Sequence, residues 1–98
     1  MDGQERAQRS LVQLQGALLQ AIADEQVIPA RHHAQVHEAI DLLRASRADR
    51  ILLQRAEAVS CIMHVMPLFL RQGRINAYAS ARLRLRAAVC QLGAPASW

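Results

Sequence analysis

Apolar residues between positions 7 and 22 recur at the spacing of an amphipathic helix. The stripe consists of Ala7, Leu11, Leu14, Leu18 and Ala21, widened by Val12, Leu19 and Ile22. Alternating steps of four and three residues place such side chains on one helix face. Pro29 suits the first position of a following helix, because its missing N–H has no partner there. The short connection between the two segments favours an antiparallel helical hairpin.

The stretch from Ala30 to Met66 contains neither glycine nor proline. Its apolar residues form one stripe of Val36, Ile40 and Leu43 and a second of Ile51, Leu52, Val59, Ile62, Met63 and Met66. Between the stripes, Ser46 is followed three residues later by Asp49, which is typical of a helix-starting capping pair. We therefore predict two helices with a break near Ser46, with one long helix as the alternative.

Residues 56–70 are apolar around nearly the whole circumference of a helix. Such a segment is typical of a central helix or of a subunit interface. Pro67 disturbs a helix interior, so we expect the helix to kink or end near Met66, ahead of a turn at Gln72 and Gly73. The stretch is shorter than the roughly 20 residues that a membrane span needs, and we predict no span.

The segment 75–89 admits two interpretations. Every odd position is apolar and most even positions are polar, as in an amphipathic strand. At helical period, one face is formed by Tyr78, Ala81, Leu85, Ala88, Val89 and Leu92. Asn76 can cap the start of such a helix, and Gly93 can end it. Ala, Leu and Arg favour helix, and a lone strand has no evident pairing partner, so we predict a helix.

These patterns predict a single all-α domain over residues 1–98, with loose tails at 1–5 and 94–98. The architecture is a small bundle of about four helices that begins with a hairpin and contains a central apolar helix. A chain of 98 residues can build one modest core, and no Pro-, Gly- or Ser-rich linker divides it.

Positive charge is concentrated in the last two fifths of the chain. Residues 1–57 contain seven arginines and eight acids, whereas residues 58–98 contain five arginines and no acid. The five are Arg71, Arg74, Arg82, Arg84 and Arg86. We interpret them as a solvated face or as a binding surface for an acidic protein. Nucleic acid is the alternative, although neither a helix-turn-helix pattern nor an aromatic stacking platform accompanies them.

Two residue pairs have the spacing of metal ligands on a helix. His33 and His37 are four residues apart, and Cys61 and His64 are three apart. Together they could bind zinc, but no Cys-x-x-Cys or His-Glu-x-x-His signature supports this, and a buried Cys beside a hydrogen-bonded His is the simpler interpretation. No nucleophile elbow or phosphate-binding loop is visible, so we predict neither an enzyme nor a cofactor.

The first ten residues are polar and contain no apolar run typical of a secretion signal. We therefore expect a cytoplasmic protein. In that compartment Cys61 and Cys90 are expected to be reduced, buried, small apolar side chains.

Residues 56–70 carry more apolar surface than one chain of this size can bury. We therefore predict that a second molecule covers part of this surface. We expect a helical protein-interaction module, such as a regulator, inhibitor or chaperone-like adaptor, that binds an acidic protein through its arginines and forms a homodimer. The residues expected to self-associate are Val59, Ile62, Met63, Met66 and Phe69. The alternatives are a basic nucleic-acid-binding transcriptional regulator and a metal-responsive helical sensor.

Overall fold

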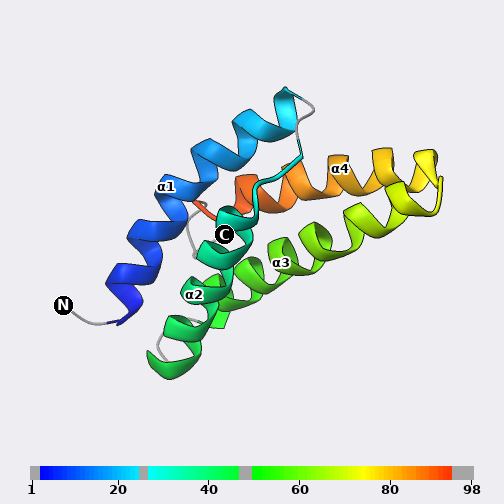
Figure 1. The fold of residues 1–98 in the computed structure, drawn as a ribbon. Helices are drawn as coiled ribbons and strands as arrows, with labels where there is room; N and C mark the ends of the chain where they lie inside the picture. The colour runs from blue at the N-terminus through cyan, green and yellow to red at the C-terminus, as the bar shows by residue number, and fades with distance from the viewer. Residues whose placement is uncertain (1–2, 25–26, 47–49, 94–98) are drawn as a thin grey trace.

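A computed structural model describes residues 3–24, 27–46 and 50–93, which form four α-helices (Figure 1). These are α1 (Gly3–Ala23), α2 (Ala30–Ser46), α3 (Arg50–Arg71) and α4 (Ile75–Gln91). Helix α1 packs against α2 and α4, and α3 packs against the same two helices. The prediction of a small all-α bundle is confirmed, and the described residues contain no strand.

One apolar core joins all four helices, and α1, α2 and α4 contribute the faces that their periodicity predicts. The core includes Ala7, Leu11, Leu14, Leu18 and Ile22 of α1, Val36, Ile40 and Leu43 of α2, and Ala81, Leu85 and Val89 of α4. Residues 75–91 form a helix, so the strand interpretation of this segment is wrong. Leu83 shows why, because it is 67% exposed although a strand would place it on the same face as the fully buried Leu85.

The break between α2 and α3 lies where the sequence predicts it, but Ser46 does not start the second helix. Ser46 is the last residue of α2, and its hydroxyl donates a hydrogen bond to the carbonyl of Leu43 at 3.0 Å. Asp49, its expected capping partner, lies outside the described residues. Asn76 is likewise no cap, because α4 begins at Ile75 and its N-cap residue, Arg74, makes no side-chain capping bond.

Helix α3 continues past Pro67 and ends at Arg71, so of the two alternatives expected near Met66 the helix end is wrong, and the kink stays a prediction. Proline has no backbone N–H, so this helix has one hydrogen bond fewer at Pro67. The turn at Gln72 and Gly73 is confirmed. The Arg74 N–H donates to the Phe69 carbonyl at 2.9 Å and the Gly73 N–H to the Leu70 carbonyl at 3.1 Å, which is the Schellman arrangement of a helix C-terminus.

Alanine in place of Gly73 and alanine in place of Gly16 should change the free energy of unfolding in opposite directions. Gly73 has a φ of 70°, which alanine adopts only with strain, so Gly73→Ala should lower the free energy of unfolding by about 1 kcal/mol. Gly16 lies inside α1 with no atom near its missing Cβ, so Gly16→Ala should raise it by about 0.5 to 1 kcal/mol. Urea denaturation of both variants measures the two changes in the free energy of unfolding. Changes in the same direction would contradict this expectation.

Among the described residues, Gln15 and Arg44 make polar contacts from one helix to another. The Gln15 side-chain amide of α1 donates to the carbonyls of Val89 and Cys90 at 3.0 and 3.2 Å, satisfying acceptors in the last turn of α4. Arg44 of α2 and Glu57 of α3 form an ion pair at 3.0 Å, with side chains 58% and 43% exposed. An ion pair this exposed contributes about 0 to 1 kcal/mol, so packing dominates.

Two further expectations need correction. Helix α1 begins at Gly3, so residues 3–5 are not a loose tail, while residues 1–2 and 94–98 lie outside the described part of the chain. Cys61 and Cys90 are exposed rather than buried. The reason is helical geometry, since Cys61 lies two residues from both Val59 and Met63 and therefore faces away from the core that they enter.

Candidate functional site

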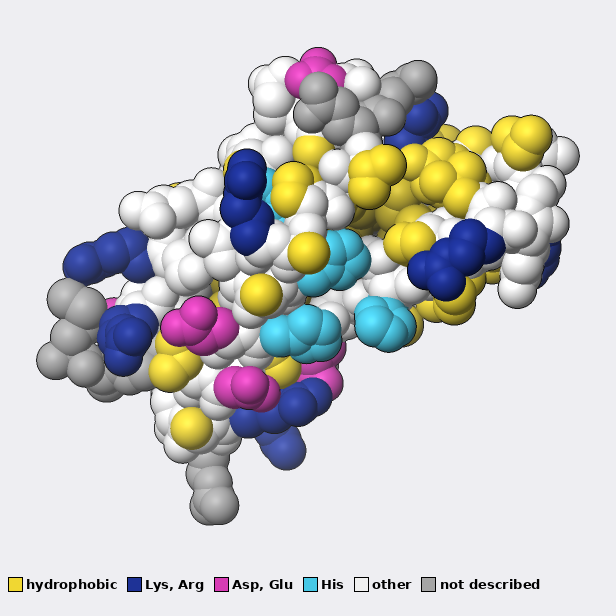
Figure 2. Space-filling model, viewed as in Figure 1, with side chains coloured by type: hydrophobic (Ala, Val, Ile, Leu, Met, Phe, Trp, Pro, Cys, Tyr) yellow, Lys and Arg dark blue, Asp and Glu magenta, His cyan; other side chains and the backbone are white. Residues whose placement is uncertain are grey.

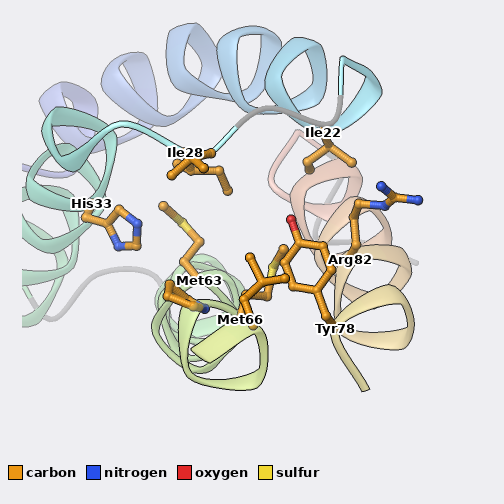
Figure 3. A pocket seen from close by; sticks show the side chains of 10 residues that line it. Ile22, Ile28, His33, Met63, Met66, Tyr78 and Arg82 are labelled. Atoms are coloured by element: carbon orange, nitrogen blue, oxygen red, sulfur yellow. The ribbon is translucent and has the colours of Figure 1, made fainter. Parts of the chain in front are cut away.

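An apolar groove opens where the α1–α2 connection meets α3 and α4 (Figure 3). Its cavity volume is about 70 Å³. The residues that line the apolar groove are Ile22, Val27, Ile28, His33, Met63, Met66, Pro67, Leu70, Tyr78 and Arg82. A pocket of this size is below the roughly 300 to 1,000 Å³ of typical small-molecule sites.

The groove has a buried floor and an exposed rim. Met63 and Met66 of α3 are 2% and 6% exposed and form the floor. Val27 and Leu70 are 81% and 47% exposed and lie on the rim. Figure 2 shows a broad apolar area on this side of the molecule, bordered by arginine. Clustered exposed apolar side chains of this kind are typical of interaction surfaces.

Three polar side chains border the groove. His33 of α2 lies on one side, and Tyr78 and Arg82 of α4 lie on the other (Figure 3). The aliphatic stem of Arg82 lines the wall while its guanidinium points away from the Tyr78 ring (Figure 3). The site is therefore apolar inside and positively charged at one edge.

A second cavity, the α1–α4 hollow, adjoins the groove. It has a volume of about 720 Å³ and is more open and more polar. Its lining residues are Gly16, Leu19, Gln20, Ile22, Ala23, Arg82, Leu83, Arg86 and Cys90. Ile22 and Arg82 line both cavities, so the two cavities are neighbours.

The pKa of His33 is lowered from its ordinary value of 6.5. Burial is the largest cause, followed by repulsion from the positive charges that His64, His37 and His32 carry when protonated. His64 belongs to α3, so this repulsion acts across the α2–α3 interface. Figure 2 shows histidines gathered on this face.

Acidification should therefore destabilise the fold through His33. Its folded-state pKa is below the unfolded value of 6.5, so the unfolded chain binds more protons, and stability falls as the pH drops below about 6.5. We expect His33→Gln to reduce the loss of stability between about pH 7.5 and pH 5.5 in urea titrations. An unchanged pH dependence in this variant would contradict a role for His33.

The predicted arginines are spread over two surfaces. Arg71 and Arg74 are exposed at the α3–α4 turn, Arg84 and Arg86 are exposed on α4, and Arg82 is half-buried. The Arg74 guanidinium lies over the Phe69 ring, 5.0 Å from its centroid. Of the five, Arg82 and Arg86 line the wall of one cavity together.

The expected self-association residues lie mostly in the core. Val59, Met63 and Met66 are 0%, 2% and 6% exposed within a single chain, while Ile62 and Phe69 are partly buried against the same core. Assigning the first three to a dimer surface is therefore wrong, because the protein's own helices cover them. Self-association stays a prediction, but these three residues do not form its contact surface.

The metal-site prediction is not supported. Among the described residues, no three His, Cys, Asp or Glu side chains lie close enough to hold a metal ion. His37 and His64 both contribute to lowering the pKa of His33, but Cys61 is exposed and does not complete a site with them.

Sequence reasoning missed the α1–α2 connection as part of the site. Val27 and Ile28 line the groove together with Leu70 and Pro67. The available signal was the pair of consecutive apolar residues between the acidic end of α1 and Pro29, which is unusual for a short exposed turn.

Among the described residues, one helix, Arg50–Arg71, is long and apolar enough to cross a membrane by length and composition. The prediction of no span was based on residues 56–70, and the helix is longer, with 22 residues. A core helix of a bundle that is mostly buried meets the same criteria. Helix α3 buries Leu52, Ala56, Val59, Met63 and Met66, and 28% of its apolar 18-residue window is buried.

The part of the chain that the structure describes defines the class as a small all-α protein, with four helices in that part. Comparisons of the chain with family models, with curated proteins and with solved structures found no match.

Proposed function

We propose that this chain is a protein-interaction module, of the regulator or adaptor kind, that binds another protein through the apolar groove and the neighbouring arginines. The observation that supports it most is the combination on one surface of exposed apolar rim residues and arginine. Val27 and Leu70 expose apolar area, and Arg82 lies at the edge of the same cavity. Protein interfaces commonly pair an apolar centre with a polar rim, and arginine is enriched in them.

The charge of this region supports an acidic partner. Residues 58–98 contain five arginines and no acid. Opposite charge on the partner raises the association rate and excludes basic competitors.

Photo-crosslinking in the native host tests the proposal. A photoreactive amino acid at position 70, on the groove rim, should form an adduct with a different protein. The matched control is position 68, since Leu68 is 43% exposed on the same helix but does not line the groove. Adducts only with nucleic acid or only with a second copy of the chain would contradict the proposal, as would equal adducts from the two positions.

A further inference from the structure

We propose that the apolar groove and the α1–α4 hollow together bind one amphipathic helix of a different protein, with an apolar side chain in the groove and carboxylates beside Arg86. This inference rests on the proposed function and specifies the chemistry of the partner.

The shape of the surface favours a helix as the occupant. The two cavities share Ile22 and Arg82 in their walls, so they are neighbours on the surface and one elongated ligand can reach both. The first is narrow and mostly apolar, and the second is wide and includes polar side chains. An amphipathic helix matches this arrangement, because it carries apolar and charged side chains on adjoining faces along one axis.

The groove has room for a single anchoring side chain. Its volume of about 70 Å³ is smaller than a roughly 150 Å³ engineered cavity that admits benzene. Helices that bind in grooves insert individual apolar side chains spaced by three or four residues. The open rim at Val27 and Leu70 leaves space for the rest of such a helix to lie across the surface.

The charge on the α4 side specifies carboxylates. Arg86 is exposed and lines the hollow with Arg82, and α4 itself contains no acid. On the α1 side of the hollow, by contrast, there is a carboxylate, that of Asp24, which accepts a hydrogen bond from the Gln20 side-chain amide at 2.9 Å. Guanidinium groups bind carboxylates in paired, charge-assisted hydrogen bonds, so an acidic flank facing α4 is favoured.

The same charges disfavour two other occupants. In a symmetric dimer this face would meet its own copy, whose α4 contains no acid to pair with Arg86. Duplex DNA offers phosphates to Arg86 but has no apolar side chain to fill the groove.

The probe for a direct test is a fluorescent synthetic helix of about five turns, with leucines along one face and glutamates on the adjoining face. A matched peptide carries lysine in place of each glutamate. Fluorescence anisotropy with the full chain should show binding of the acidic peptide and at least about tenfold weaker binding of the basic one.

Matched protein variants separate this site from general attraction. Leu70→Gln and Arg86→Glu should each weaken binding of the acidic peptide about tenfold. Leu68→Gln and Arg84→Glu should stay within about twofold of the unchanged protein, because both residues are exposed but line neither cavity. Arg86→Glu should also improve binding of the basic peptide. Circular dichroism and urea denaturation show that each variant folds.

Several results would overturn this inference. They are equal binding of the two peptides and equal losses of binding in the control variants. Sedimentation that shows the chain self-associating instead of binding the peptide would also overturn it, as would displacement of the peptide by duplex DNA at moderate salt. If crosslinking at position 70 captures a partner protein while the acidic peptide does not bind, the stated partner chemistry is wrong and the proposed function stands. Failure of both experiments contradicts the proposed function.

Discussion

Replacing Val59 by aspartate should abolish cooperative folding. Val59 is 0% exposed, and a carboxylate there would lose its hydration in a core that consists of apolar side chains. Burying an unpaired charge costs several kcal/mol, which is comparable with the about 5 to 15 kcal/mol that stabilises a typical domain. Circular dichroism during urea titration should show loss of the cooperative transition, or a transition at much lower urea.

The matched control is Ala58→Asp, one position away on the exposed side of α3. It should cost less than about 1 kcal/mol, mainly through the lower helix propensity of aspartate. This pair also tests the corrected role of Val59. If the Val59→Asp variant folds and differs only in its sedimentation, Val59 belongs to a subunit interface and not to the core.

Leu85→Ala should lower the free energy of unfolding by about 2 to 5 kcal/mol. Leu85 is 0% exposed and belongs to the core cluster that joins the four helices, so truncation removes buried apolar area and leaves a cavity. Leu83→Ala should change it by less than about 0.5 kcal/mol, because Leu83 is 67% exposed.

Equilibrium urea denaturation measures this difference with the same chemical change at two neighbouring positions. A helix separates residues 83 and 85 onto different sides, whereas a strand would give them equal burial. Equal losses of stability for the two leucines would therefore contradict the helical structure of residues 75–91.

Periodicity and residue preference were sufficient to predict the helices. The stripe from Ala7 to Ala21 enters the core as expected, because α1 has one apolar face and only that face can be covered. In residues 75–89 the apolar pattern fits two structures, and the preference of Ala, Leu and Arg for helix decided correctly between them.

The pattern of apolar positions alone was insufficient to predict which side of α3 is buried. Because residues 56–70 are apolar on nearly every side, their periodicity does not indicate a direction for the core. Packing of α2 and α4 against α3 decides it by covering Val59, Met63 and Met66 and leaving Leu68 and Leu70 exposed.

The candidate site shows the same division. The sequence by itself determined the four helices, most of their buried faces and the concentration of arginine after residue 57. Only the tertiary structure decided that Ile22, Ile28, His33, Met63 and Tyr78 line one groove (Figure 3). Local periodicity orients a side chain around its own helix axis, whereas a groove depends on how separate segments pack together, and that arrangement is a property of the whole core.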